Sequence, residues 1–127
     1  MRRVLVDTSV WVDHFRHRNE ALSDLLGLDR VMVHPMVLGE LACGTPPSRS
    51  RTLADLGRLE PTQQASVREV IAFVEREQLF GLGCGLVDVT LLASTLLTKD
   101  VVLWTLDRRL TGLADRFGVA HRPSVAP

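Results

Sequence analysis

The chain opens with MRRVLVDTSVWVD at residues 1–13, and this stretch decides which kind of sheet we expect. Val4, Leu5 and Val6 form a short run without a polar residue, which is typical of a strand buried on both faces. A carboxylate, Asp7, follows at once. Because burying a carboxylate costs free energy unless something compensates its charge, the presence of Asp7 at the exit of such a strand needs an explanation.

Two further apolar runs, at residues 31–33 and 101–104, repeat the pattern of a short buried strand, and residues 119–120 could add an edge strand. The segments between them have apolar residues at helical spacing. We expect helices at 8–16 (capped by Thr8 or Ser9), 19–27 (capped by Asn19), 35–42, 48–59, 62–78, 86–97 and 107–117. Short apolar strands separated by helices predict an α/β fold in three layers, α/β/α, with a central, mainly parallel sheet and one domain over residues 1–127.

The composition narrows the class of protein. The chain has 127 residues, of which 46% are hydrophobic, so we expect a globular fold and no disorder. No apolar run approaches the roughly 20 residues that span a membrane, and Asp7 interrupts the N-terminal apolar stretch too early for a signal peptide. Cys43 and Cys84 lack metal-ligand spacing, so we expect two reduced, packed thiols in a cytoplasmic protein.

The formal charge of the chain argues neither for nor against binding to nucleic acid. Fifteen basic residues balance fifteen acidic ones, and all the basic residues except Lys99 are arginines. The planar guanidinium group fits phosphate well, although a genomic bias toward arginine codons would give the same composition.

Four acidic residues lie where a simple surface role explains them poorly. Asp7 and Asp107 each follow the carboxyl end of a predicted strand, and these ends share one rim of a parallel sheet. Glu40 in MVLGELACG and Asp88 in GLVDVTLLAS lie in unusually apolar helices. Asp88 and Asp107 could each cap a helix, but Glu40 lies in mid-helix, so we favour one shared site.

A site built from carboxylates alone favours hard divalent cations such as Mg²⁺ or Mn²⁺. Such an ion can activate water and neutralise the charge that develops during phosphoryl transfer. Histidine ligands are not expected, because His14 and His17 lie on an exposed-looking helix and the other two, His34 and His121, are isolated.

The same residues carry a resemblance to a known family. DTSVW after the first strand, ELACG after the second, VD before a core helix ending in LLAS, and TLD after a later strand together resemble the PIN domain. The likeness is strongest to VapC-type toxins of bacterial toxin–antitoxin pairs and runs over the whole chain in order. It implies a PIN-like fold in which Asp7, Glu40, Asp88 and Asp107 are the catalytic residues and hold one or two Mg²⁺ or Mn²⁺ ions.

The resemblance also implies an activity and partners. Ser9 would support the metal site, and Thr105 would position Asp107. The protein would be a metal-dependent endoribonuclease that cleaves RNA, paired with a cognate antitoxin protein, as a homodimer or a toxin–antitoxin hetero-oligomer. It assigns no residue to substrate binding. Arg108 and Arg109 flank Asp107 and are candidates for phosphate contact, although a solubilising surface role would explain them as well.

The early helices carry more apolar residues than a small core obviously needs. We expect them to form a groove for an amphipathic antitoxin segment, or else to belong entirely to the core. They are Trp11, Phe15, Leu22, Leu25, Leu26 and the leucines between Leu53 and Leu59.

Two other functions are compatible with an α/β chain of this length. A PIN fold could be kept as a binding module without catalysis, but the complete set of four acids argues against that. A receiver domain needs a pair of acids after the first strand, an acceptor Asp after a middle strand and a Lys after a later one. Here one Asp follows the first strand, His34 and Pro35 follow the second, and Lys99 precedes its strand.

Overall fold

A four-stranded parallel sheet forms the centre of the computed structural model, which describes residues 2–123. The strands are β1 (Arg3–Val6), β2 (Val31–Val33), β3 (Glu60–Pro61) and β4 (Val101–Trp104), in the order β3-β2-β1-β4. Every neighbouring pair is parallel. The three strands predicted from apolar runs are confirmed, and an isolated bridge between Ala120 and Leu103 supplies the short edge pairing expected there.

Pairs of helices connect the strands. They are α1 (Thr8–His17) and α2 (Glu20–Gly27) between β1 and β2, α3 (Pro35–Ala42) and α4 (Arg49–Leu56) between β2 and β3, α5 (Val67–Glu77) and α6 (Leu86–Leu97) between β3 and β4, and α7 (Arg108–Arg116) after β4. The chain moves from β1 outward to β3 and then returns across the sheet to β4. Because crossovers between parallel strands are right-handed, this reversal places the two groups of helices on opposite faces.

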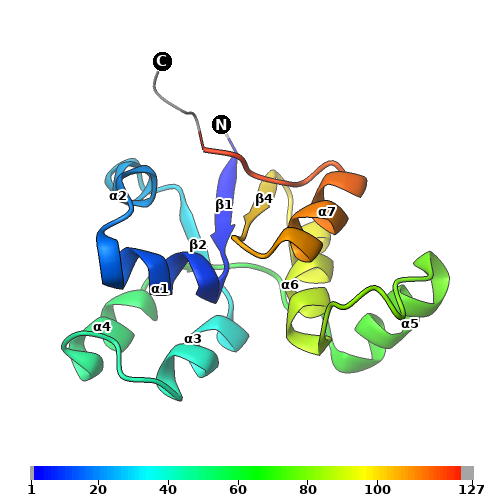
Figure 1. Ribbon diagram of the computed structural model, residues 1–127, viewed down its shortest axis with the longest axis horizontal. Helices are drawn as coiled ribbons and strands as arrows, with labels where there is room; N and C mark the ends of the chain where they lie inside the picture. The colour runs from blue at the N-terminus through cyan, green and yellow to red at the C-terminus, as the bar shows by residue number, and fades with distance from the viewer. Residues whose placement is uncertain (1, 124–127) are drawn as a thin grey trace.

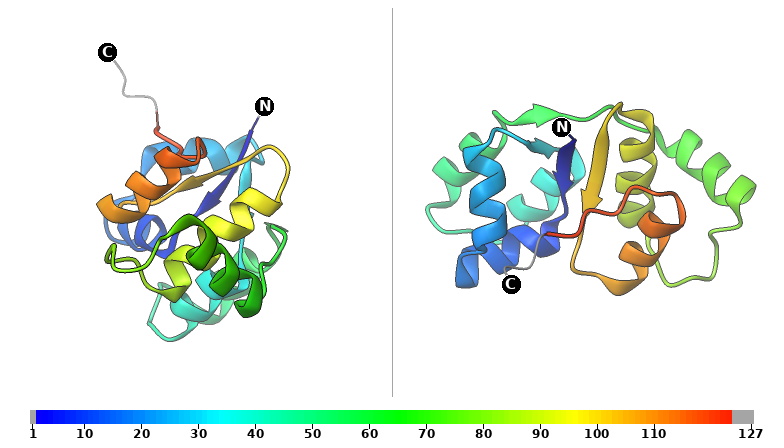
Figure 2. Two further views of the ribbon diagram at one scale, coloured as in Figure 1. Left: turned by 90° about the vertical axis from the view of Figure 1, so that its right-hand side faces the viewer. Right: turned by 90° about the horizontal axis from the view of Figure 1, so that it is seen from above.

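The helices and the sheet form the predicted three layers. Figure 1 shows α1 to α4 on one side of the strands and α5 to α7 on the other, and the second view in Figure 2 shows the same division from above. Val4, Leu5 and Val6 of β1 are fully buried between the layers. Complete burial of a Val or Leu side chain contributes roughly 1.5–3 kcal/mol, so this central strand anchors both halves of the core.

Helix α6 is the most deeply buried helix, as its nearly uniform apolar sequence predicted. All its residues from Val89 to Thr95 are buried, and it packs against α5, α7 and β4. Its polar residues bond within the fold: Thr95 Oγ1 donates to the carbonyl of Leu91 at 2.8 Å. Because the C-terminal end of α6 leads into the start of β4, the N-terminal end of α6, with Asp88, lies at the carboxyl edge of the sheet.

Several predicted boundaries and caps are wrong. Thr8 and Ser9 lie inside α1 and do not cap it, because their hydroxyls bond to carboxylates of other elements or of the preceding strand end. Helix α4 ends at Leu56, before residue 59. Helix α5 begins only at Val67, because Ser66 and Glu69 form a capping box at that point.

The sequence left open whether the apolar residues of the early helices form a groove or belong to the core. Most of them belong to the core, since Trp11, Leu22 and Leu25 are buried. Both cysteines are unpaired, but Cys43 is exposed where a packed thiol was expected. None of the helices in residues 2–123 has the length and apolar character needed to cross a membrane.

His34 joins the second strand to the core on the other face of the sheet. Its Nδ1 accepts a hydrogen bond from the backbone N–H of Met36 at 3.0 Å, which caps α3, so the proton of the neutral ring lies on Nε2. Nε2 then donates to Ser94 Oγ of α6 at 3.1 Å. The imidazole is 2% exposed, and this burial lowers the pKa of His34.

We therefore predict that the protein loses stability as the pH falls below about 6.5, the ordinary pKa of histidine. The neutral imidazole of His34 stabilises the fold fully above its unfolded pKa, and that contribution disappears as the pH falls toward the lower folded pKa. One such group changes the unfolding free energy by at most about 1.4 kcal/mol per pH unit. The slope, measured by urea unfolding, should be shallower in His34→Asn and unchanged in the exposed control His17→Asn. An equal slope in all three proteins would exclude this role for His34.

Candidate active site

Asp7 lies at the carboxyl end of β1, where its side chain is 6% exposed. Two hydroxyls compensate for its burial: Ser9 Oγ donates to Asp7 Oδ2 at 2.7 Å, and Thr105 Oγ1 donates to the same oxygen at 2.8 Å. Hydrogen bonds from these hydroxyls replace part of the hydration that a buried carboxylate loses, so the pair offsets part of the desolvation cost. Both bonds end on Oδ2, which leaves Oδ1 of Asp7 without a hydrogen bond in the described residues.

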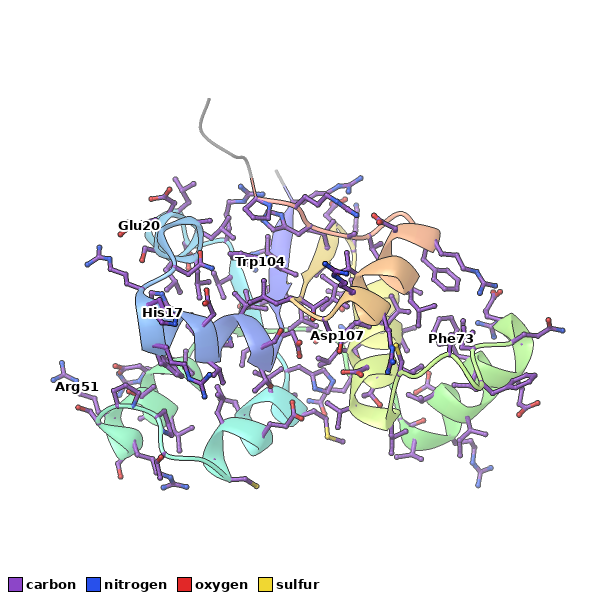
Figure 3. All side chains as sticks on the ribbon, in the orientation of Figure 1. His17, Glu20, Arg51, Phe73, Trp104 and Asp107 are labelled. Atoms are coloured by element: carbon purple, nitrogen blue, oxygen red, sulfur yellow. The ribbon has the colours of Figure 1, made fainter. Side chains whose placement is uncertain are left out.

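The two hydroxyls also connect Asp7 to the loop after β4. Ser9 Oγ accepts from the backbone N–H of Leu106 at 3.0 Å, and Thr105 Oγ1 accepts from the backbone N–H of Asp107 at 3.1 Å. Ser9 and Thr105 therefore lie next to Asp7 and Asp107, as the resemblance implied. Figure 3 shows Asp107 near the middle of the molecule, below Trp104 at the end of β4.

Asp107 is exposed and caps α7 with one oxygen. Its Oδ1 accepts from the backbone N–H groups of Arg109 at 2.8 Å and Leu110 at 3.1 Å. The capping role that the sequence left open is thus real, but it uses only Oδ1. No hydrogen bond within residues 2–123 involves Oδ2 of Asp107, so the carboxylate keeps a free oxygen.

Glu40 lies on α3 and is held from α1. Thr8 Oγ1 donates to Glu40 Oε1 at 2.6 Å, a bond between residues 32 positions apart in sequence. Thr8 is a site residue that the sequence analysis missed, because a threonine at a helix start reads first as a cap. The two consecutive hydroxyl residues in DTS were the available signal that both could bond to carboxylates. Thr8 donates to Glu40, and Ser9 donates to Asp7.

Asp88 lies in the first turn of α6 and is electrostatically coupled to the other three acids. Burial is the main reason that the pKa of Asp88 is raised; a hydrogen bond from the backbone N–H of Gly85 at 3.4 Å opposes this, and the negative charges of Asp7, Asp107 and Glu40 add to it. The fold thus brings all four predicted acids to one electrostatic neighbourhood at the carboxyl edge of the sheet. Figure 1 shows β1 and β4 pointing toward the region where α1, α3 and α6 approach one another.

The donor chemistry fits a hard divalent cation, although the carboxylates do not form a closed cage. Within residues 2–123, no group of three or more His, Cys, Asp and Glu side chains is arranged so that it could hold a metal ion as it stands. Each of the four acids nevertheless has one oxygen held by the protein and one oxygen free of hydrogen bonds to described residues. Mg²⁺ commonly uses one or two carboxylates and keeps several waters, which this set allows.

The fold and the four acids define the class to which the chain belongs. A family model described as the PIN domain matches residues 4–115. The chain is therefore a member of the PIN-domain family, as its motifs suggested, and the sheet order and helix layers described above are those of its PIN domain.

Known proteins narrow the similarity further. The chain is 41% identical over 123 residues to the protein named Ribonuclease VapC32 in two strains of Mycobacterium tuberculosis, covering 97% of this chain and 99% of the relative. Its fold is similar to that of a chain in the crystal structure of DNA-bound VapBC from Salmonella typhimurium, with a TM-score of 0.63 and 17% identity over 94% of this chain and 96% of that one. The resemblance to VapC-type proteins is thus shown along the whole chain.

The raised pKa of Asp88 leads to a stability prediction. A carboxylate whose folded pKa lies above its unfolded value destabilises the fold at high pH, and the penalty fades as the pH falls toward about 4. In EDTA at pH 7.5, we expect Asp88→Asn to melt a few degrees above the wild type, since the amide oxygen can still accept from Gly85. The advantage, followed by calorimetry, should shrink at acid pH.

A control and a ligand complete this test. Asp24→Asn, on the exposed surface of α2, should melt like the wild type. Mn²⁺ should raise the wild-type midpoint because it binds only the folded site, and it should raise that of Asp88→Asn much less. An Asp88→Asn protein that melts below the wild type in EDTA and responds equally to Mn²⁺ would mean that Asp88 acts only as a cap.

Proposed function

We propose that the protein is a Mg²⁺- or Mn²⁺-dependent endoribonuclease and the toxin of a toxin–antitoxin pair. The observation that carries the proposal is that the two oxygens of each carboxylate differ in their hydrogen bonding. The four carboxylates are those of Asp7, Glu40, Asp88 and Asp107. One oxygen of each is fixed by the fold, and the other is left for a ligand. The 41% identity to a protein named as a ribonuclease supports RNA as the substrate.

The charge of the site explains why a cation is required. Four carboxylates in one neighbourhood repel the phosphates of RNA, so the apo site opposes its own substrate. A divalent ion, when bound, would neutralise this repulsion, activate water and stabilise the charge on the phosphate that is cut. Asp7, Glu40, Asp88 and Asp107 are the residues that would hold it, and Ser9, Thr105 and Thr8 keep Asp7 and Glu40 in orientation.

The PIN fold as a binding module without catalysis remains the second candidate. It is disfavoured by the cost of the site: four acids that repel one another bring no stability to a protein that does not need them. A module that bound RNA through this surface would also gain from basic residues in place of these acids.

We predict that the purified protein, freed of antitoxin, cleaves RNA with Mg²⁺ or Mn²⁺ and stops in EDTA. Asp7→Asn and Asp88→Asn should each lower the cleavage rate at least ~10²-fold, because the contribution of the ion is several kcal/mol. Asp24→Asn is the matched control and should cleave at the wild-type rate. Cleavage that continues undiminished in chelator would rule out the metal-dependent reading.

The proposal of an antitoxin partner rests on the resemblance to VapC-type toxins. A cavity of about 400 Å³ between α1, α3 and the loop after α3 opens beside Thr8 and Glu40, and we propose that an antitoxin segment enters it. Its lining combines apolar residues with two threonines, one arginine and the carboxylate of Glu40; the lining residues are Thr8, Val12, Phe15, Arg16, Glu40, Leu41, Gly44, Thr45, Pro46 and Pro47. The groove is thus smaller than the one predicted from the sequence, because most of the apolar residues named there are core.

We predict that the product of the neighbouring reading frame co-purifies with the chain and suppresses its ribonuclease activity. Thr45→Trp places a large side chain in the cavity from an exposed position, so it should weaken this complex. Gln64→Trp, at an exposed position in the loop before α5 and outside the cavity, is the control, and pull-down of the tagged neighbour is the measurement. A complex equally strong in both variants would place the antitoxin elsewhere.

A further inference from the structure

A close contact between Gly83 and Arg109 links the turn before α6 to the start of α7. Arg109 Nη1 donates to the carbonyl oxygen of Gly83 at 3.5 Å. A Cβ atom on Gly83 would lie 2.8 Å from both Cδ and Nη1 of Arg109. The Arg109 side chain therefore lies directly over the face of Gly83, where only a glycine leaves room for it.

This contact holds the Arg109 guanidinium beside the acidic site. The thiol of Cys84, next to Gly83, feels Asp88, Asp107 and Arg109 together: after burial, the two acids raise the pKa of Cys84 and Arg109 lowers it. Arg109 also follows Asp107 by two residues and gives its backbone N–H to the Asp107 carboxylate. Its cationic group thus lies over the turn before α6, beside Cys84, while its backbone is bonded to Asp107.

The guanidinium is nevertheless not neutralised there. The ion pairs found within residues 2–123 join other residues, and none includes Arg109. Its side chain is exposed, and its one hydrogen bond goes to an uncharged carbonyl. A cation that is held near acids, unpaired and open to solvent can accept an anion without first breaking an ion pair.

We propose that Arg109, positioned by Gly83, binds an RNA backbone phosphate adjacent to the one that is cut and thereby sets the register of the strand at the acidic site. The inference rests on the proposed ribonuclease function. Acids that hold a cation repel every neighbouring phosphate, so a fixed guanidinium beside them gives the strand one favourable position. Because the contact with Gly83 holds the long side chain in place, less conformational entropy is lost on binding.

Arg109 and its neighbour Arg108 differ in the contacts that their side chains make. Both are exposed and flank Asp107, and both were candidates for phosphate contact from the sequence. The Arg108 side chain makes no hydrogen bond or ion pair with any of residues 2–123, so nothing fixes it near the acids. Arg108→Ala is therefore a matched control that removes the same charge from the same helix turn.

The first test measures binding of a short single-stranded RNA of mixed sequence in EDTA, where no cleavage is expected, at several salt concentrations. Arg109→Ala should bind about tenfold more weakly and lower the salt slope by roughly 0.7, the value for one lost phosphate contact on a single strand. Arg109→Lys should recover part of the affinity, and Arg108→Ala should retain nearly all of it. With Mn²⁺, the loss in Arg109→Ala should fall on KM more than on kcat.

The second test moves Arg109 without mutating it. Gly83 has φ +84° and Gly81, in the same turn, has φ +72°, but a Cβ on Gly81 would meet nothing within 4 Å. Gly81→Ala therefore reports backbone strain alone, whereas Gly83→Ala adds displacement of Arg109. We expect Gly83→Ala to weaken RNA binding severalfold beyond Gly81→Ala at a similar melting temperature, and to have no further effect on binding in an Arg109→Ala background.

The outcomes separate this inference from the proposed function. Arg109→Ala that binds and cleaves like Arg108→Ala, with the wild-type salt slope, would overturn the role of Arg109 even if the wild type cleaves RNA. A wild type that shows the Arg109-dependent salt slope but cleaves nothing with any divalent ion would sink the ribonuclease proposal and leave the phosphate contact supported. Equal effects of Gly81→Ala and Gly83→Ala would overturn the positioning role of Gly83.

Discussion

The arrangement of the carboxyl edge depends on one buried charge. Asp7 is the only acid among the buried residues of the described chain, and it ends a strand whose three preceding side chains are fully buried. An ion in that position must be compensated, and the compensation comes from two hydroxyls that both bond to Oδ2. Since one hydroxyl belongs to α1 and the other to the loop after β4, satisfying Asp7 fixes the approach of these segments and brings Asp107 into the same neighbourhood.

A protein selected for stability alone would not keep this edge. Burial and three like charges raise the pKa of Asp88, so its ionised form costs stability at neutral pH. The hydrophobic core on both faces of β1 and around α6 supplies the stabilisation that offsets the cost. A destabilising acid beside the edge of a parallel sheet is typical of a site in which function sets the residue type and the rest of the fold supplies the stability.

How far the sequence predicts the structure depends on whether partners are near in sequence. The strands β1, β2 and β4 and helix α6 followed from uninterrupted apolar runs, and the Asn19 cap from a local pattern. The strand β3 did not, because Glu60 and Pro61 are exposed and pair with β2 only once the sheet exists. Two other contacts likewise join segments that are distant in sequence: the hydrogen bond from Thr8 to Glu40 and the contact of Arg109 with Gly83. Local propensity therefore indicated neither of them.

The two alternatives that the sequence posed for Asp88 and Asp107, a helix cap or a functional acid, are not exclusive. A carboxylate has two oxygens, and Asp107 caps α7 with Oδ1 while Oδ2 stays free of protein hydrogen bonds; Asp88 bonds Gly85 through Oδ2 alone. The capping hydrogen bond orients the carboxylate, and it thereby also orients the second oxygen, which is available to a ligand. Structural and functional roles therefore differ in what they require. A cap needs an acceptor, which an amide also supplies, whereas a cation needs the charge, and only a change of charge without a change of shape separates them.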